Sequence, residues 1–545
     1  MIRKREIRDI RIVYAPPFSV GEFGGEVDNF RWPRHGGDFA FFRAYVAKDG
    51  HTAPYAPDNV PFTPKGWLKI ERNGVKAGDF VMVAGFPGET SRMRLPEEFD
   101  NEIKWVAPQA IQAYERQVAI IDDAASARPD IATKYAIFTV IAKNEIVRSR
   151  ALIGAARAND ASNEFHAEDA ELRAWLANPA NLAAAKLPAN TLSKIAALKS
   201  IEQKEIERQN QLFVLSKLHQ WNFFTTAYRA VRLAYEREKP DADRAVSFHE
   251  RDEAMIQNSE EQADSRYDLN VDKRLLVDSL TSYLALPRSQ RIPSLDTWLG
   301  SAPTPEALTL KVDALFAGSQ ILDVRKRVAW THMSLQQMRS EHDAWLQLMI
   351  SVVPDIARVE GEADALKSEE GADRDAYVAA RQAFAHAHGA PTYPDANGTL
   401  RISYGNVQGE NAADGVAYTP FTTLNGITAK STGVEPFNVP QSELVAIQSK
   451  QYGRYASTEL KSVPVNFLSD SDTTGGNSGS PTLDAQGHLV GLVFDSVFEG
   501  IDSDWLYSGE KRRSVHVDVR FMLWYLHEVD HAESVLSELS FTQDR

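Results

Sequence analysis

The residue pattern of this 545-residue chain changes twice, and these changes limit the folds it can adopt. Residues 1–90 contain short β-branched or aromatic runs bounded by Gly, Pro and Asp, which is typical of strands and turns. Residues 91–390 are rich in Ala, Glu, Lys, Leu and Gln and poor in glycine. Residues 391–545 return to the β pattern and end in a helical stretch. We therefore expect a β plus α protein in which a helical domain is inserted into β structure.

The middle region shows helical periodicity. In residues 334–353, apolar side chains recur at steps of three and four and predict one face of a helix. His342 falls on the same face and is expected to be a core residue. The members of this face are Leu335, Met338, His342, Trp345, Met349 and Val352.

Composition excludes several functional classes. The chain has 60 basic and 75 acidic residues, a net charge of −15, which argues against a nucleic-acid or anionic-membrane partner. The absence of cysteine excludes disulfides, thiol catalysis and cysteine-ligated zinc. No apolar run approaches the roughly 18 residues of a membrane span, and no export signal is recognisable at the N-terminus.

The stretch "DTTGGNSGSP", residues 472–481, has the features of a loop that presents a nucleophilic serine, Ser478. It lies between two predicted strands, 462–468 and 488–495. Gly475 and Gly476 allow a tight turn, and the N–H groups of Gly476 and Ser478 are spaced to form an oxyanion hole. The alternative is a Gly/Ser-rich hairpin loop without chemistry.

A serine nucleophile of the trypsin-like type requires an acid upstream, because its triad follows the order His, Asp, Ser. The stretch "DNFRWPRHGGDF", residues 28–39, offers Asp28 and Asp38. The alternative interpretation is a turn rich in Pro, Gly and Asn.

Together the two stretches resemble the bacterial dipeptidyl-peptidase 7 and 11 family of serine exopeptidases. That family has a tract like "DNWxWPRHTGDF" and a loop like "GGNSGSP", which residues 475–481 match. The resemblance implies a chymotrypsin-like double β-barrel with a large inserted α-helical lid. It divides the chain into residues 1–90, the remaining part of the first barrel, residues 91–390, the lid, and residues 391–545, the second barrel with a terminal helix. Other tracts of the resemblance are "VAGFPGETSR" (83–92), "YEREKPDADRAVSFHERD" (235–252), "GTLRISYGNVQG" (398–409) and "VHVDVRFML" (515–523).

The resemblance also implies roles for individual residues. Ser478 corresponds to the nucleophile and Asp38 to the acid that orients the histidine. The anchor for the free amine of the substrate corresponds to Asn29, Phe30, Asn144 and Asp495. A carboxylate and two amide oxygens can satisfy the three N–H donors of an ammonium group. The anchor would stop cleavage after two residues.

Three positions depart from the family pattern. Phe30 replaces a Trp and Gly36 replaces a Thr. Ser496 lies where the family sets the preference for the second substrate residue, with Gly for apolar and Arg for acidic side chains. Because Ser496 carries no positive charge, we expect apolar or small side chains.

The histidine of the triad is the missing element. Among 13 histidines only His35 precedes Asp38, and three residues of spacing disfavour it as the base. His516 lies in a strand-like tract and could face either side. The family's base lies far upstream of its Asp, so we expect the catalytic His to be absent from this chain. The chain would then be a truncated reading frame, a partial chain or a peptide-binding relative without activity.

The stretch "HEVDH", residues 527–531, matches a zinc-protease signature. It would place His527 and His531 on one helical face with Glu528 as the base. A third ligand is missing, apart from the nearby acids Glu533 and Glu538. We expect the polar face of a terminal helix, with neither metal nor cofactor.

Two hypotheses follow. One is a dipeptidyl aminopeptidase that releases dipeptides from peptide N-termini through an acyl-enzyme on Ser478. The other is a non-catalytic peptide-binding relative. The resemblance further implies a homodimer in the periplasm or at the cell surface.

Overall fold

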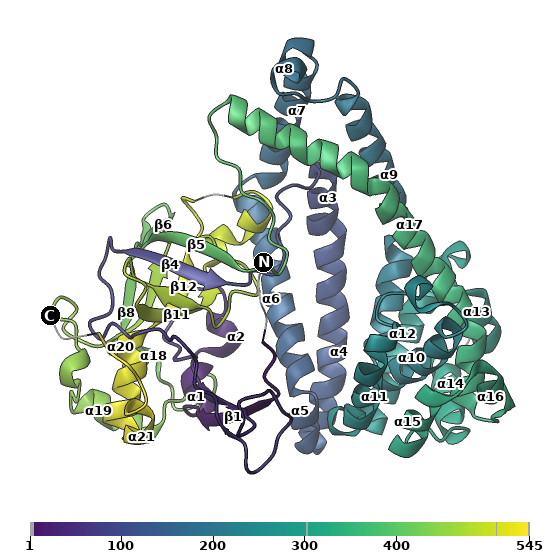
Figure 1. Cartoon of the computed structure of the whole chain (residues 1–545), viewed down its shortest axis with the longest axis horizontal. Coiled ribbons are helices and arrows are strands. Elements are labelled where there is room, and N and C mark those ends of the chain that lie inside the picture. Colours follow the sequence, from purple (N-terminus) through teal and green to yellow (C-terminus); the bar gives the residue numbers. More distant parts are fainter. Residues whose placement is uncertain (1–4, 301–303, 508, 543–545) are drawn as a thin grey trace. The chain divides into compact units, whose positions relative to one another are not determined.

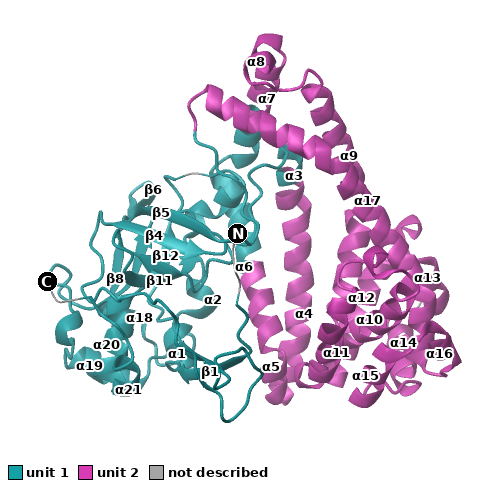
Figure 2. Cartoon of the chain, viewed as in Figure 1, with its two compact units in different colours: residues 1–99, 147–167, 391–545 teal, residues 100–146, 168–390 magenta. Residues whose placement is uncertain are grey.

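The computed structural model describes residues 5–300, 304–507 and 509–542. The chain forms two compact units, shown in different colours in Figure 2. Unit 1 contains residues 1–99, 147–167 and 391–545, and unit 2 contains residues 100–146 and 168–390. Helices and antiparallel strands are both present, as the sequence predicted for the fold class.

Unit 1 is built on two main antiparallel sheets. A three-stranded sheet has the order β1-β2-β3, and a seven-stranded sheet has the order β5-β4-β10-β11-β12-β9-β8. A separate hairpin pairs β6 with β7. The strands are β1 (Asp9–Tyr14), β2 (Phe41–Val46), β3 (Val60–Pro61), β4 (Phe80–Gly85), β5 (Arg401–Asn406), β6 (Glu410–Ala413), β7 (Val416–Tyr418), β8 (Phe421–Thr423), β9 (Pro464–Ser469), β10 (Pro481–Leu483), β11 (Leu489–Ser496) and β12 (Ser514–Asp518).

The seven-stranded sheet explains the order of the residue patterns. Strand β4 precedes the helical region and β5 follows it, and the two pair with each other from Phe80↔Asn406 to Gly85↔Arg401 (Figure 1). The chain therefore leaves and re-enters the sheet at neighbouring positions, where a long insertion is tolerated. Strand β4 belongs to residues 1–90, which the resemblance assigns to the first barrel, and it pairs with β10 and β5 of the C-terminal region.

The sheet also curves back on itself. A bridge between Val407 and Ser469 joins the end of β5 to the end of β9, although these strands are not neighbours in the main order. Strands β9 and β12 are buried along their whole length. The interior of the sheet therefore forms a core that positions the ends of β10 and β11.

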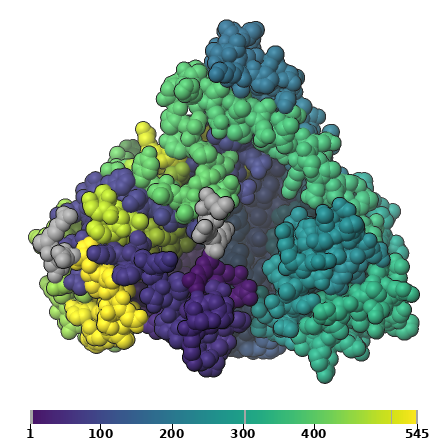
Figure 3. Space-filling view, viewed as in Figure 1, coloured from purple at the N-terminus to yellow at the C-terminus, as the bar shows by residue number. Residues whose placement is uncertain are grey.

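The three-stranded sheet has a more open face. Ile12 and Phe42 are cross-strand partners, and each is 64% exposed. This N-terminal part of the chain is the purple surface in Figure 3. Short helices complete unit 1: α1 (Phe18–Gly21), α2 (Gly25–Asp28), α18 (Leu424–Lys430), α19 (Gln441–Gln448), α20 (Val519–Trp524) and α21 (Glu533–Leu536).

Unit 2 is helical, and its largest core contains buried aromatic and aliphatic side chains of α9, α10, α12 and α17. Helices α3, α6 and α7 each cross a boundary between the units. None of the helices among the described residues combines the length and apolar character that a membrane span needs. The α-helices in and around this unit are α3 (Pro96–Asn101), α4 (Ala107–Ala127), α5 (Asp130–Lys134), α6 (Ala136–Ala158), α7 (Ala161–Leu176), α8 (Pro179–Ala184), α9 (Thr191–Leu218), α10 (Asn222–Glu236), α11 (Glu253–Gln262), α12 (Leu269–Leu284), α13 (Pro293–Leu299), α14 (Pro305–Ala317), α15 (Val324–His332), α16 (Leu335–Ser340) and α17 (Ala344–Ala387).

The helix predicted over residues 334–353 is interrupted. Helix α16 ends at Ser340, and α17 begins at Ala344. The carboxylate of Asp343 caps α17 by accepting hydrogen bonds from the N–H groups of Trp345 (3.0 Å) and Leu346 (3.3 Å). His342 lies in the break and is exposed, so its expected place in the core is wrong.

Asp272 is a carboxylic acid buried inside unit 2. It lies on α12 and is 2% exposed, and the Tyr135 hydroxyl donates to its Oδ1 at 3.3 Å. Burial raises the pKa of Asp272 to about 7, against the hydrogen bond from Tyr135. The folded protein therefore binds a proton at this carboxyl over a pH range in which the unfolded chain has lost it.

This raised pKa predicts a pH dependence of stability. Because the folded pKa lies above the unfolded value of about 4, the free energy of unfolding should fall as pH rises from about 4 to about 7. Asp272→Asn cannot ionise and should remove this slope, so the variant should exceed the wild type in stability by a few kcal/mol at about pH 8. Urea unfolding at several pH values measures this. The exposed Asp375→Asn is the matched control, and an unchanged slope in Asp272→Asn would contradict the assignment.

Candidate active site

The serine loop, residues 472–481, is fastened at both ends. At its start, Arg92 binds Asp472 through two parallel hydrogen bonds of 2.7 and 2.8 Å, and the Gly88 N–H donates to the Gly475 carbonyl at 2.7 Å. At its end, the Gly479 N–H donates to the Val493 carbonyl at 2.8 Å. The tract 83–92 therefore supports this loop, and β11 holds it against the sheet.

Ser478 is exposed at the tip of this loop. Its Oγ donates a hydrogen bond to the Phe494 carbonyl on β11 at 3.4 Å, which is the hydroxyl's one hydrogen bond to the residues that the structure describes. The hydroxyl is therefore presented to solvent beside the residue that precedes Asp495.

Gly476 and Ser478 present their N–H groups without an acceptor in the described part of the chain. Gly476 has φ +100°, and a Cβ atom there would lie 2.6 Å from the Gly88 nitrogen and 2.7 Å from the Phe86 carbonyl oxygen. Only glycine fits this backbone and this approach. Within the described ranges, the N–H groups of Gly476 and Ser478 have no hydrogen-bond acceptor. They are free to donate to an incoming oxygen atom.

Asp495 holds a buried carboxylate next to this loop. Its side chain is 5% exposed. The Ser496 N–H donates to Oδ1 at 2.7 Å and the Phe30 N–H to Oδ2 at 3.1 Å, while Nη1 of Arg34 lies 3.3 Å from Oδ2. Burial raises the pKa of Asp495, and Arg34 is the strongest influence against it. Phe30 adopts φ +55°, a conformation that non-glycine residues rarely take, and this turns its N–H toward the carboxylate.

The tract 28–39 is anchored to the sheet beside Asp495. The Trp32 indole N–H donates to the Thr419 carbonyl at 3.1 Å, and the Asn466 amide donates to the Gly36 carbonyl at 2.9 Å. Lys430 binds the Asp28 carboxylate at 2.7 Å. A Cβ at Gly36 would lie only 3.1 Å from the Gly21 carbonyl oxygen, so glycine suits this close approach.

Asp38, the expected acid of the triad, lies near the end of the tract 28–39. Its side chain is reached by solvent, and it accepts no hydrogen bond from the described residues. Protein atoms packed around the carboxyl nevertheless raise its pKa, and Arg34 opposes this. No hydrogen bond joins Asp38 to Ser478 or to a histidine in the described part of the chain.

The two asparagines of the expected amine anchor lie in different units. Asn29 is half-buried beside Phe30 in unit 1 and donates to Glu26 at 3.2 Å. Asn144 is an exposed residue of α6 in unit 2. Within unit 1 the structure thus brings together Ser478, Phe30 and Asp495, and Ser496 lies buried beside them.

The buried histidines of unit 1 do not face the serine. His35 packs directly against Gly426, and burial with the charges of Lys430 and Arg34 lowers its pKa to about 3. His516 faces the core of the sheet, where the hydroxyls of Ser469 and Thr482 lie 2.7 and 2.8 Å from its two ring nitrogens. Burial lowers the pKa of His516 to about 3. Both rings are neutral parts of the core.

The "HEVDH" stretch does not form the expected helical face. His527 lies in a π-helical turn, Tyr525–Val529, and His531 lies beyond its end with φ +50°. Nδ1 of His531 lies 2.9 Å from the His527 carbonyl oxygen, and Nδ1 of His527 lies 3.0 Å from Glu528. Among the described residues, the groups that could hold a metal ion do not include these two histidines. The expectation of one shared helical face is wrong because the helix ends between them.

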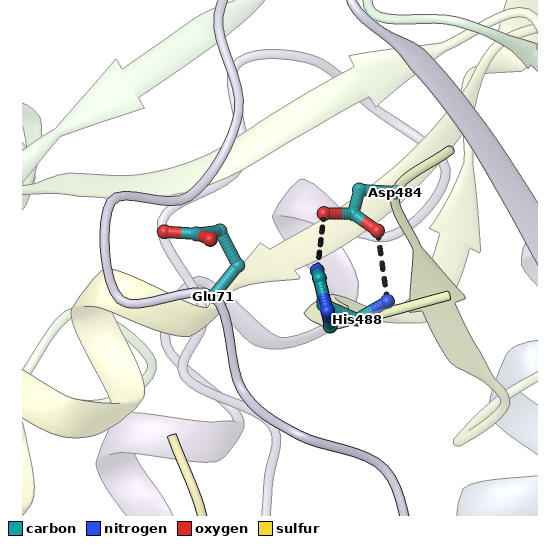
Figure 4. A group of neighbouring side chains, drawn as sticks. All are labelled: Glu71, Asp484 and His488. Atoms are coloured by element: carbon teal, nitrogen blue, oxygen red, sulfur yellow. Dashed lines mark hydrogen bonds and ion pairs between the residues drawn. The ribbon is translucent and has the colours of Figure 1, made fainter. Parts of the chain in front are cut away.

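One acid–histidine group that the sequence did not reveal is Glu71, Asp484 and His488 (Figure 4). Asp484 accepts hydrogen bonds from the N–H groups of Gln486 (2.9 Å) and His488 (2.8 Å), and Nδ1 of His488 lies 3.0 Å from its other oxygen. These contacts close the turn between β10 and β11. Sequence reasoning also missed Arg34, whose one signal was its position inside the tract 28–39.

Comparisons with known proteins place this chain in a family. The family model of peptidase S46 matches residues 1–541. An Asp/Glu-specific dipeptidyl-peptidase of Shewanella putrefaciens is 38% identical over 100% of this chain and 76% of its own length. An Asp/Glu-specific dipeptidyl-peptidase of Porphyromonas endodontalis is 31% identical over 99% and 73%.

A solved structure has the same fold. The crystal structure of Porphyromonas endodontalis DPP11 in complex with the dipeptide Arg-Glu matches with a TM-score of 0.80 and 27% identity, over 98% of this chain and 75% of that chain. The chain therefore spans about three quarters of the length of the relatives that it matches. Since the family model covers nearly the whole chain, the protein belongs to the peptidase S46 family.

Proposed function

We propose that this protein is a serine-type dipeptidyl aminopeptidase that binds peptides by their free N-terminus. The observation that carries the proposal is the placement of Ser478 against Phe494, next to the buried carboxylate of Asp495. The nucleophile candidate contacts Phe494, and the carboxylate that could bind a cation belongs to the next residue of β11. This placement fits a substrate whose amine and scissile bond lie close together. Relatives named dipeptidyl-peptidases, and a relative solved with a bound dipeptide, support the same class.

The chemistry assigned to the site is acyl transfer. Ser478 Oγ attacks the carbonyl carbon of the second residue, and the N–H groups of Gly476 and Ser478 stabilise the oxyanion. A histidine oriented by Asp38 takes the hydroxyl proton and passes it to the leaving amine as the peptide bond breaks, and water then hydrolyses the ester. Because no histidine bonds to Ser478 or Asp38 among the described residues, we expect turnover by this chain alone to be lower by several orders of magnitude.

The finer fold assignment belongs to the same proposal. The bridge between Val407 and Ser469 supports a closed second barrel of the chymotrypsin type, and β1, β2 and β3 would be part of the first. The helical region would act as a lid. We further propose that the protein forms a homodimer and acts in the periplasm or at the cell surface.

We assign the binding of the substrate's N-terminal amine to Asp495, together with Asn29, Phe30 and Asn144. Where the family carries a Trp, Phe30 has no side-chain donor, but its backbone N–H holds Asp495 in place. The anchor thus keeps its carboxylate and an apolar wall while losing one indole hydrogen bond.

A second candidate is a non-catalytic peptide-binding protein. The observation that favours it is the lack of any hydrogen bond between a histidine and Ser478 within the described ranges. Turnover of fluorogenic dipeptidyl substrates, abolished by Ser478→Ala, distinguishes the enzyme from the binding protein.

The amine anchor predicts a large effect of N-acetylation. Acetylation removes the charge and leaves Asp495 buried without the cation of the substrate, so a tetrapeptide should bind about 100-fold more weakly, a loss of ~3 kcal/mol. Isothermal titration calorimetry of the free and acetylated peptide measures this. Asp495→Asn should lose the discrimination and Ser478→Ala should keep it. Equal affinity for both peptides in the wild type would contradict the anchor.

Ser496 predicts the preference for the second residue. A small neutral side chain favours apolar or small residues, whereas the relatives named Asp/Glu-specific suggest acidic ones. We expect Ala-Leu to bind more tightly than Ala-Glu, and Ser496→Arg to reverse this order by about tenfold through a charge-assisted hydrogen bond. Competition calorimetry with the two dipeptides tests this, and a wild type that prefers Ala-Glu would refute it.

The serine loop predicts that two neighbouring glycines differ in how well they tolerate substitution by alanine. Gly476→Ala places Cβ against Gly88 and Phe86 at φ +100°, so we expect a loss of about 1–3 kcal/mol in the free energy of unfolding. Gly475→Ala is the matched control, because a Cβ there meets nothing within 4 Å. Chemical unfolding of both variants gives the comparison. Similar losses would show that the loop can adopt another backbone path.

A further inference from the structure

We propose that Arg34 is a positioning residue for peptide binding: it holds the Asp495 carboxylate charged and aimed at the substrate amine. The inference rests on the proposed function, in which Asp495 receives the amine. Arg34 has no part in the roles implied by the family resemblance.

The contacts of Asp495 show why Arg34 matters. Two backbone N–H groups hold the carboxylate, one from Ser496 and one from Phe30. In the described part of the chain, Arg34 is the one side-chain cation within ion-pair distance of Asp495, at 3.3 Å. A backbone N–H orients a carboxylate but brings no net charge, whereas a guanidinium supplies the charge that a buried anion requires.

Arg34 is held in place by packing as well as by charge. Its residue is 7% exposed, and its guanidinium lies 5.2 Å from the centre of the Phe494 ring. Phe494 precedes Asp495 on β11, and its carbonyl accepts the Ser478 hydroxyl. One strand residue therefore contacts both the nucleophile candidate and the arginine, which ties their positions together.

The charges around Arg34 leave room for a second cation. The positive charge of Arg34 lowers the pKa of three acids, Asp495, Asp38 and Glu22. Burial raises the pKa of each of them by more than Arg34 lowers it. Arg512 also lowers the pKa of Asp495 from a greater distance. One close guanidinium among three carboxylates leaves an excess of negative charge. An ammonium group that reaches Asp495 reduces this excess, whereas an acetylated N-terminus does not.

Arg34 has hydrogen-bond donors in reserve. Its Nε atom is buried and has no hydrogen-bond acceptor among the described residues, and Nη1, which lies 3.3 Å from Asp495 Oδ2, makes an ion pair there but no hydrogen bond. When an ammonium group shares Asp495, the guanidinium can therefore keep its place beside the carboxylate.

Binding measurements on Arg34 variants test this role. Arg34→Gln, Arg34→Lys and the control Arg31→Met are titrated with a free and an N-acetylated tetrapeptide at about pH 5 and about pH 8. Arg31 is an exposed residue of the same tract. We expect Arg34→Gln to bind the free peptide at least about tenfold more weakly, the size of one lost charge-assisted interaction, with the acetylated peptide unchanged. Arg34→Lys should restore most of the loss, and Arg31→Met should match the wild type.

The pH dependence separates positioning from a role in folding alone. Without Arg34 the pKa of Asp495 should rise, because Arg34 is the strongest influence that lowers it. Burial and the acid Glu22 would still raise this pKa, and two N–H groups and the distant Arg512 would still lower it. The loss of affinity in Arg34→Gln should therefore be larger at the lower pH, after the titration of the peptide amine is subtracted by reference to the wild type.

Several results would overturn the proposal. An equal loss for both peptides, a loss without pH dependence, or wild-type affinity in Arg34→Gln would each do so. If thermal unfolding shows that Arg34→Gln is not folded, the Arg34→Lys variant tests the proposal instead. An Arg34→Lys protein that binds both peptides equally would contradict a role based on charge. A wild type that does not distinguish the two peptides would instead refute the proposed function itself.

Discussion

The burial of one carboxylate organises this structure. Asp495 ends up inside unit 1 because it lies on β11, a central strand of the seven-stranded sheet. A buried anion must be hydrogen-bonded and paired, and apart from the neighbouring Ser496 N–H its partners come from residues 30 and 34. The Phe30 N–H and Asp495 are 465 residues apart in the chain. The backbone of Phe30 takes an unusual conformation to reach it. Formation of this site therefore requires the first and the last parts of the chain to pack together.

The architecture allows such distant parts to meet. Because β4 and β5 pair directly, the helical region begins and ends at adjacent positions of one sheet. The sheet can form without being disturbed by the roughly 300 residues between its strands, since the cost of closing a long loop grows only slowly with its length. Unit 1 thus gathers the serine loop, its supporting tract 83–92 and the tract 28–39 into one compact body.

Local patterns predicted helices better than they predicted where helices end. The periodic face of residues 334–353 is real on both sides of the break, yet Asp343 starts a new helix and leaves His342 in solvent. The same limit affected "HEVDH", in which the spacing of His527 and His531 suits one helix face but the helix ends between them. In the first case hydrogen bonds from the backbone to Asp343 decided the result, and in the second the backbone of His531 leaves the helical conformation. Apolar spacing reports neither.

By itself, the sequence determined the order of β and helical regions, the serine loop with its glycine turn, and the resemblance to a peptidase family that the comparisons confirm. These features depend on residues close together in the chain. Only the tertiary structure decided that Arg34 faces Asp495, that His516 turns into the core and that β4 joins the C-terminal strands. The physical reason is that the partner of a buried charge or of an unpaired strand is selected by packing between segments hundreds of residues apart, and no local spacing encodes that choice.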